Sequence, residues 1–259
     1  MQAAFDNYDP ENGDLDLSGL NITDDILTSI QNRIESLPML TRLDLSDNQL
    51  TIAPNFNLPM LTHLYLDNNQ IASFTCENSS SQTSVPNFDL PMLTRLYLDN
   101  NQLTSIPNFD LPKLTNLSLH DNRLTSVPNF NLPKLTYLCL HNNRLTSVPN
   151  FDLPKLTELY LYNNRLTTVP NFDLPMLTIL YLHNNQLDWD SRFPFMIYSS
   201  NDNRLYLHIS VDQIDNIFYH IERNIVINIY ENGKYIDKTK EIQEQNKNNI
   251  IPSRIKRVY

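Results

Sequence analysis

Side chains that could do chemistry recur at a fixed distance in the middle of the chain. Asp99, His120 and His141 follow one another in steps of 21 residues, and Cys139 lies two residues before His141. Two imidazoles and a carboxylate can hold a divalent metal, and a histidine beside an aspartate can act in acid–base catalysis. A thiol becomes a nucleophile when it is deprotonated. The sequence therefore raises three chemistries to be weighed.

The 21-residue step accounts for most of this arrangement without any chemistry. Equivalent positions of a repeated unit form a row on a regular fold, so a row of polar side chains is expected there. A flat sheet rarely supplies the tetrahedral geometry of a zinc site, and no nucleophile in a pocket accompanies the histidines. We therefore predict no metal site, no cofactor and no catalytic residue, and an ordinary free thiol at Cys139 on the exposed face.

Leucine and asparagine define the repeated unit most clearly. The segment 37–50, Leu-Pro-Met-Leu-Thr-Arg-Leu-Asp-Leu-Ser-Asp-Asn-Gln-Leu, recurs in six further copies, the last of which ends at Leu187. The step is 21 residues except from Leu58 to Leu90, where it is 32, which leaves an 11-residue insertion at about 72–82. The pattern L-x-x-L-x-L-x-x-N-x-L in seven copies resembles the leucine-rich-repeat family.

This resemblance implies an α/β solenoid, the leucine-rich-repeat horseshoe, with a parallel β-sheet on its concave face. The spacing supports the same fold, because alternating leucines point to one side of a short strand and stacked strands bury them together. The return half of each unit carries two prolines five residues apart, such as Pro128 and Pro133. These exclude a regular helix, so we expect a mostly extended or irregular convex side.

Two residue types of the unit are predicted to be structural. The ninth-position asparagine stands where the chain leaves the strand, and a buried amide there can bond the backbone of neighbouring turns. The phenylalanine of the return half should stack inside the solenoid as an aromatic spine. The asparagines are Asn48, Asn69, Asn101, Asn122, Asn143, Asn164 and Asn185, and the phenylalanines are Phe56, Phe88, Phe109, Phe130, Phe151 and Phe172.

The start of the chain departs from the regular unit. Residues 1–36 are predicted to form an N-terminal cap, with a first irregular strand at 15–22 and a helix at 24–34. Thr23 is the expected N-cap of this helix. A cap of this kind covers the open end of the leucine core, which runs through the seven repeats at 37–187.

The end of the chain also departs from the unit, because residues 188–259 contain no further full repeat. We predict a strand at 204–209, a helix at 211–221 and a hairpin at 225–236 around Asn232-Gly233. Two interpretations stay open for this region. It forms a C-terminal cap of the solenoid, or a small appended domain with its own partner.

The outward strand positions vary freely from copy to copy, whereas the leucines and asparagines hardly change. The resemblance implies that these positions line the binding face. Tyrosine offers a large contact area at low entropic cost, so we predict a protein-binding surface. The middle row, between the two strand leucines, contributes Tyr65, Tyr97, Tyr160 and Tyr181, and the exit row, two residues further on, contributes Asp67, Asp99, His120, His141, Tyr162 and His183.

Composition limits the partner and the compartment. The net charge of −10 disfavours binding to nucleic acid or to anionic lipid. The start has no secretory signal pattern, and no apolar run approaches the roughly 18 residues that a membrane-spanning helix needs. Two cysteines are too few for disulfide caps. We expect a monomeric, cytoplasmic protein, in style similar to repeat proteins of amoeba-infecting giant viruses and intracellular bacteria.

Two functional hypotheses follow. In the first, the chain is a non-enzymatic scaffold that binds an unidentified protein on the concave face. In the second, it is a substrate-targeting or regulatory subunit of a phosphatase or ubiquitin ligase that docks through its C-terminal region. A ubiquitin ligase of the type that joins such repeats to a catalytic cysteine is disfavoured, because residues 188–259 contain no cysteine.

Overall fold

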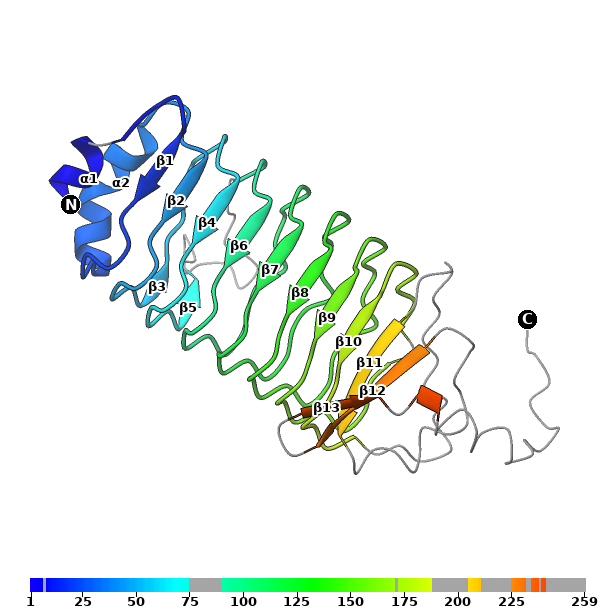
Figure 1. Cartoon of the computed structure of the whole chain (residues 1–259). Helices are drawn as coiled ribbons and strands as arrows, with labels where there is room; N and C mark the ends of the chain where they lie inside the picture. The colour runs from blue at the N-terminus through cyan, green and yellow to red at the C-terminus, as the bar shows by residue number, and fades with distance from the viewer. Residues whose placement is uncertain are drawn as a thin grey trace, which may run out of the picture.

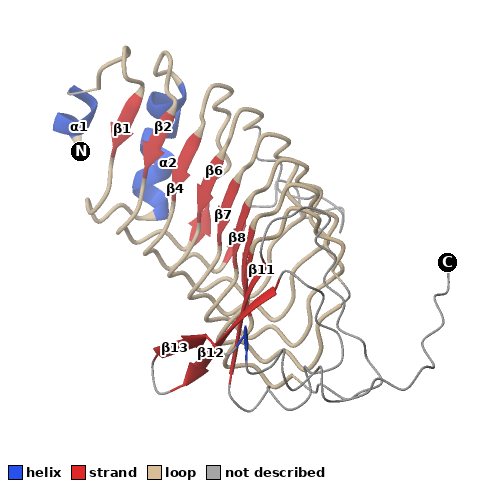
Figure 2. Cartoon of the chain, turned by 45° about the vertical axis from the view of Figure 1, so that its right-hand side comes forward, coloured by secondary structure: helices blue, strands red, loops and turns tan. Residues whose placement is uncertain are grey.

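The computed structural model is a solenoid with residues 2–35 at one end and residues 205–237 at the other (Figure 1). Each repeat makes one turn, with a short strand on one side and an irregular return segment behind it, as Figure 2 shows. The predicted solenoid with a parallel sheet is thereby confirmed. The residues that the structure describes are 1–6, 8–74, 90–170, 172–187, 205–210, 225–231, 234–237 and 239–240.

One eleven-stranded sheet runs the length of the solenoid. Its strands, in spatial order, are β1 (Asp14–Asp16), β2 (Arg42–Asp44), β4 (His63–Tyr65), β6 (Arg95–Tyr97), β7 (Asn116–Ser118), β8 (Tyr137–Cys139), β9 (Glu158–Tyr160), β10 (Ile179–Tyr181), β11 (Leu205–Ser210), β12 (Ile225–Glu231) and β13 (Lys234–Asp237). All neighbouring pairs are parallel except β12 and β13, which are antiparallel. The register keeps equivalent residues of successive repeats side by side, which places their outward side chains in rows.

The insertion leaves the sheet register unchanged. Leu64 of β4 pairs directly with Leu96 of β6, although these residues are 32 positions apart. The extra residues therefore do not alter the pairing of β4 with β6. Residues 75–89, which include most of the insertion and Phe88, lie outside the described part of the chain. Just before them, β5 (Ser73–Phe74) pairs with β3 (Ile52–Ala53) in a short parallel sheet that the sequence did not predict.

The leucines of the repeat form one continuous core. Both strand leucines of each repeat are fully buried, for example Leu117 and Leu119 of the repeat that holds β7. The described phenylalanines of the predicted spine, Phe56, Phe109, Phe130, Phe151 and Phe172, are at most 2% exposed. Fully burying one leucine or phenylalanine stabilises the fold by about 1.5–3 kcal/mol. Because each repeat contacts only its neighbours, this energy accumulates along the solenoid.

The described return segments contain no helix, as their prolines predict. A regular feature of each turn is an aspartate or asparagine with positive φ directly before the buried asparagine. These residues are Asp47, Asn68, Asn100, Asp121, Asn142, Asn163 and Asn184, with φ between 52° and 56°. Asparagine and aspartate tolerate this left-handed conformation better than other non-glycine residues. This explains how the chain makes repeated tight turns with so little glycine.

Two helices lie at the N-terminal end, α1 (Gln2–Asp6) and α2 (Asp24–Glu35). Helix α2 forms where the sequence predicts it, and the Thr23 side chain caps it by accepting a hydrogen bond from the Ile26 amide. Helix α1, which the sequence did not predict, buries Phe5 at the end of the core. The Arg33 guanidinium of α2 covers the Phe5 ring at 3.9 Å. None of the described helices is long and apolar enough to cross a membrane.

At the other end the sheet continues past the last regular repeat. Strand β11 extends the sheet from β10, and β12 and β13 form the predicted hairpin beside it. The turn 232–233 and the predicted helix 211–221 lie outside the described residues. The division of the chain at residues 36 and 187 stays a prediction.

Candidate functional site

Buried asparagine side chains hold the ends of successive strands together. The Asn122 side-chain amide donates to the carbonyl of Leu98 in the preceding repeat at 2.9 Å, and its oxygen accepts from the Leu103 amide at 3.0 Å. The same group lies 3.2 Å from the carbonyls of its own turn, at Leu119 and His120. Equivalent bonds occur at Asn48, Asn69, Asn101, Asn143, Asn164 and Asn185.

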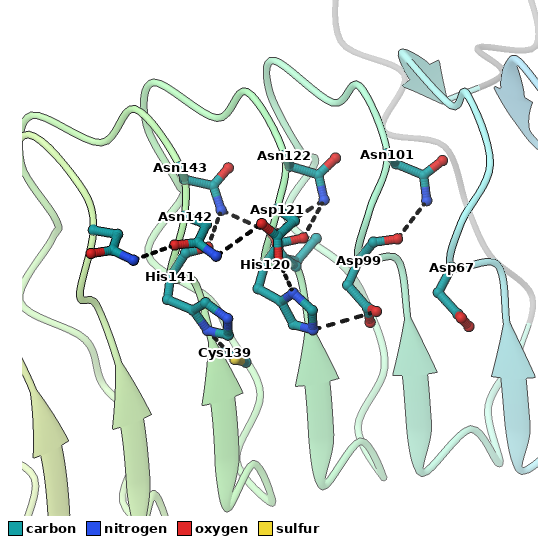
Figure 3. A network of polar contacts seen from close by, with 12 residues as sticks. Asp67, Asp99, Asn101, His120, Asp121, Asn122, Cys139, His141, Asn142 and Asn143 are labelled. Carbon is teal, nitrogen blue, oxygen red and sulfur yellow. Dashed lines mark hydrogen bonds and ion pairs between the residues drawn. The ribbon is translucent and has the colours of Figure 1, made fainter. Parts of the chain in front are cut away.

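This asparagine ladder has a direct consequence for the outward residues. Each asparagine bonds both its own turn and the preceding one, so the exits of neighbouring strands are held in the same conformation (Figure 3). Asn101 continues the ladder across the insertion, because it donates to Leu66 and accepts from Ile71. The side chains that follow each strand therefore project from a rigid frame.

The outer sheet face is the surface formed by the middle and exit rows of strands β1 to β10. Most of its side chains are partly exposed, including Tyr65, Tyr97, Tyr160 and Tyr181 of the middle row. Four of its members are instead buried, at 9% exposure for Ser46, 4% for Ser118, 1% for Cys139 and 3% for His183. The prediction that Cys139 lies on the exposed face is therefore wrong. Rings surround this small side chain, because His141 and Tyr137 of the same repeat contact the thiol and Tyr160 lies on the next strand.

The exit row contains a continuous stack of rings. His120, His141, Tyr162 and His183 follow one another with centroids 4.3–4.6 Å apart and planes about 10° apart. These distances match the spacing of neighbouring strands, which is about 4.8 Å. Ring stacking therefore needs no departure from the register. Such pairs contribute about 0.5–1.5 kcal/mol each beyond the area they bury.

The middle row contains two shorter stacks. Tyr65 lies on Tyr97 at 4.8 Å, and Tyr160 lies on Tyr181 at 4.9 Å. The small residues Ser118 and Cys139 separate these two pairs. Tyr137, which precedes the inward leucine of β8, leans against Tyr160 at 5.3 Å. The outer sheet face thus carries stacked tyrosines on both sides of Ser118 and Cys139.

Two aspartates of the exit row lie side by side on neighbouring strands. Loss of solvent raises the pKa of Asp67 to about 6, and the nearby charges of Asp99, Asp44 and Asp47 add to this effect. Asp99 is 3.4 Å from Nε2 of His120, while Asp67 makes no ion pair with any described residue. Figure 3 shows the two carboxylates on adjacent strands. At neutral pH Asp67 therefore carries a negative charge that no ion pair among the described residues offsets.

Cys139 and His141, at the centre of the face, do not form an activated nucleophile. Burial raises the pKa of Cys139 to about 12, so its thiol is protonated at neutral pH. Its sulfur lies 2.9 Å from Nδ1 of His141, and burial lowers the pKa of His141 to about 4. A neutral imidazole beside a protonated thiol lacks the ion pair that activates catalytic cysteines.

One group of metal-ligand atoms occurs among the described residues, formed by His120, Asp121 and His141 within 4.8 Å of one another. Asp121 takes the place that the sequence suggested for Asp99. The two imidazole planes differ by only 10°, so their nitrogen lone pairs run parallel rather than toward a common point. In addition, His120 Nδ1 already lies 2.7 Å from the Asp121 carboxylate. A metal ion at this place would require one ring to leave the stack.

The C-terminal hairpin covers one end of the outer sheet face. Tyr235 of β13 packs edge-on against Tyr181 and His183, with centroids 5.7 and 5.6 Å away. Its hydroxyl lies 3.5 Å from Nε2 of His183. This contact joins residues 52 positions apart, and no repeat pattern could have predicted it. His183, a predicted contact residue, is consequently buried by the chain itself.

Two further ladders escaped the sequence interpretation. At the strand entrances, each repeat's threonine hydroxyl donates to the carbonyl of the equivalent threonine before it, as Thr115 does to Thr94 at 3.0 Å. At the exits, Asn142 donates to Asp121 at 2.9 Å, and Asn163 donates to Asn142 at 2.6 Å. The unvarying threonine in each L-T-x-L was the available signal for the first ladder.

Comparisons with known proteins agree with this architecture. The parallel-sheet solenoid, with its buried leucines and its asparagine ladder, places this chain in the class of solenoid repeat proteins. A two-copy leucine-rich-repeat model matches residues 38–78, 91–132 and 112–153, and a second leucine-rich-repeat model matches residues 133–187. These matches cover more than half of the chain, which therefore belongs to the leucine-rich-repeat family.

Solved structures show the same fold. The leucine-rich-repeat domain of a Shigella effector has a TM-score of 0.52 and 24% identity, over 72% of this chain and 74% of that one. An internalin-like protein of Listeria monocytogenes has a TM-score of 0.52 and 21% identity, over 85% of this chain and 60% of that one. At these identities the similarity concerns the fold alone. A search of the curated proteins finds no match.

Proposed function

We propose that the chain is a non-enzymatic interaction module that binds a protein on its outer sheet face. The observation that carries this proposal is the set of three ring stacks, which expose tyrosine and histidine together with carboxylates over a rigid frame. Aromatic side chains that are already ordered lose little entropy on binding. Leucine-rich-repeat proteins are generally interaction modules rather than enzymes.

The proposed contact residues are those of the middle and exit rows that remain accessible. They are Tyr65, Asp67, Tyr97, Asp99, His120, His141, Tyr160 and Tyr162, with Tyr181 at the margin. His183 is left out because the hairpin buries it. The Cys139 thiol supplies no nucleophile to this surface, since it is neither exposed nor ionised.

Charge reversal on the face provides the test. The double variant Asp67→Lys/Asp99→Lys and a matched control, Asp110→Lys/Asp152→Lys, change the net charge equally, but the control residues are exposed in the return segments. Proteins captured from a host-cell extract are compared by quantitative mass spectrometry. A partner should be retained by the wild type and the control and lost by the face variant, while circular dichroism shows that both variants remain folded. Partners that survive the face variant would exclude this surface.

The alternative role, a targeting or regulatory subunit that docks through residues 188–259, also stays open. Within its docking region the structure describes β11, β12, β13 and residues 239–240, and their geometry does not favour this role over the first proposal. Deleting residues 224–259 separates the two roles. If every captured partner survives the deletion, the docking role is lost, whereas loss of an enzyme subunit alone would support it.

A further inference from the structure

We propose that the part of the outer sheet face over β2–β7 binds a basic polypeptide segment, whose arginine or lysine groups stack on the tyrosines and pair with the aspartates. This inference rests on the proposed function and adds the chemistry of the partner. It is carried by the aromatic stacks, by the charge of this part of the face and by one contact that the chain makes with itself.

The chain's own contact is that of Arg42 with Tyr65. The Arg42 guanidinium lies over the Tyr65 ring, 4.7 Å from its centroid, and its terminal nitrogen is 3.4 Å from the Asp44 carboxylate. A cation over a tyrosine face is stabilised by the ring quadrupole, and more so when a carboxylate is beside it. This face therefore already accommodates one guanidinium by stacking and ion pairing together.

The neighbouring strands repeat the aromatic and acidic parts of that contact, and Arg95 of β6 lies beside Tyr97 but forms no ion pair with Asp67 or Asp99. Tyr97 stacks on Tyr65 from β6, and Asp67 and Asp99 follow the same two strands. Asp99 is paired only with His120, and Asp67 has no ion-pair partner in the described part of the chain. A guanidinium or ammonium group from outside would supply the positive charge that this pair of carboxylates lacks.

The charge of the whole N-terminal half of the face points the same way. From β1 to β7 the middle and exit rows carry Asp16, Asp44, Asp67 and Asp99 and no lysine or arginine, whereas the positions before the first strand leucine carry Asp14, Arg42 and Arg95. An excess of one sign on a binding face steers oppositely charged segments toward it and repels those of like charge. An acidic partner segment is therefore disfavoured.

The C-terminal part of the face is closed to the same segment. Tyr235 lies on Tyr181 and His183, so the hairpin occupies the surface over β10. The exit row between the two regions is filled by the stacked rings of His120, His141 and Tyr162. A bound segment is thus expected to lie over the acidic strands and to end against these rings.

A defined peptide provides the first measurement. A fluorescein-labelled peptide of five Arg-Gly units is titrated with the full chain, and binding is followed by fluorescence anisotropy at 50 and 200 mM salt. We expect Asp67→Asn/Asp99→Asn to weaken binding on the order of ten-fold, and the control Asp110→Asn/Asp152→Asn to stay within about two-fold. Equal weakening by the two double variants would overturn the inference, because general charge attraction would then suffice.

A second measurement separates this inference from the proposed function. A random peptide library is selected on the wild type and then counter-selected on a Tyr97→Ala/Asp67→Asn/Asp99→Asn variant. Face-dependent peptides rich in arginine or lysine would support the inference. Face-dependent peptides without basic residues would overturn it while leaving the binding face intact. Selection of no face-dependent peptide at all would count against both the inference and the proposed function.

Discussion

Tyr235 of β13 packs edge-on against Tyr181 of β10, with ring centroids 5.7 Å apart and planes at 71°. These residues belong to different parts of the chain, a C-terminal hairpin and the last regular repeat. Their contact closes one end of a surface that the repeats alone would leave open. The aromatic residues of the last repeat therefore pack against the chain's own C-terminal hairpin.

Removal of this contact should expose His183. In the wild type His183 is 3% exposed, so it should resist diethyl pyrocarbonate, whereas Tyr235→Ala should make it reactive. Peptide mapping by mass spectrometry measures the modification at each histidine. Tyr206→Ala is the control, because Tyr206 is 40% exposed on β11 and has no ring contact with His183. If His183 is modified to the same extent in the wild type as in Tyr235→Ala, the result would contradict the hairpin contact.

The asparagine ladder should be a large local source of stability. Asn122→Ala removes four short contacts to backbone groups, and each buried group left without a partner costs about 1–3 kcal/mol. We expect the free energy of unfolding in urea to fall by about 3 kcal/mol. Asn150→Ala, at an exposed return-segment position, should change it by less than about 0.5 kcal/mol. Similar losses of unfolding free energy in both variants would show that the ladder asparagine contributes no more to stability than an exposed one.

The positive φ before each ladder asparagine makes a separate prediction. Asn100 has a φ of 52° and an exposed side chain without a hydrogen bond to any described residue. Asn100→Gly should be tolerated, whereas Asn100→Val should lower the free energy of unfolding by about 1–2 kcal/mol because a β-branched residue resists this conformation. Thermal unfolding of the two variants side by side measures the difference. An equal midpoint for both would refute the backbone explanation.

Asp67 should make folding depend on pH in a defined direction. Its pKa is raised to about 6 by burial and by the charges of Asp99, Asp44 and Asp47, which face it from the neighbouring repeats. A raised pKa means that the folded state favours the protonated carboxyl, so this stabilisation is full below about pH 4 and is lost as pH rises toward 6. Asp67→Asn should therefore gain about 1 kcal/mol over the wild type at pH 7 and little at pH 4.

Urea unfolding measures the free energy of unfolding of both proteins at pH 4 and pH 7. The gain is the variant-minus-wild-type difference at pH 7 less the same difference at pH 4. The comparison removes the opposite contribution of His141, whose pKa is lowered and which loses stability as pH falls. The affinity for a basic peptide should also depend on ionisation of Asp67, but with the opposite pH dependence, because a cation favours the ionised carboxylate. Its affinity should be weaker at pH 5 than at pH 7.5 in the wild type, and the Asp67→Asn variant should lose most of this difference.

Cys139 should be inert in the folded protein. It is 1% exposed and its pKa is raised to about 12, whereas alkylation requires an accessible thiolate. Iodoacetamide at pH 8 should label the peptide that contains Cys139 only after urea is added. Rapid labelling in the native state would mean that the rings of the outer sheet face open readily.

The fold was predictable because its signals are local and repeated. Leucines at alternating positions, the asparagine at the strand exit and two prolines per return segment each specify a conformation within one repeat, and stacking multiplies them. The helix after Thr23 and the hairpin before Asp237 were also predictable from capping and turn patterns. The outward rows followed from the strand period, so the candidate face could be drawn before its side chains were placed.

The details of the face could not be predicted in this way. Whether an outward residue is exposed depends on the size of its neighbours on adjacent strands, which is why Cys139 is buried although its strand position points outward. The choice between Asp99 and Asp121 beside His120 and His141 depends on side-chain rotamers, which spacing does not specify.

The sequence by itself determined the solenoid, its register and the residues of its outward rows, because each depends on a period shared by all copies. Only the tertiary structure decided that the rings stack, that the charge of Asp99 helps raise the pKa of Asp67, and that Tyr235 covers His183. These relationships join side chains on different strands or from different regions. They arise from packing and electrostatics across space, for which a repeat pattern carries no information.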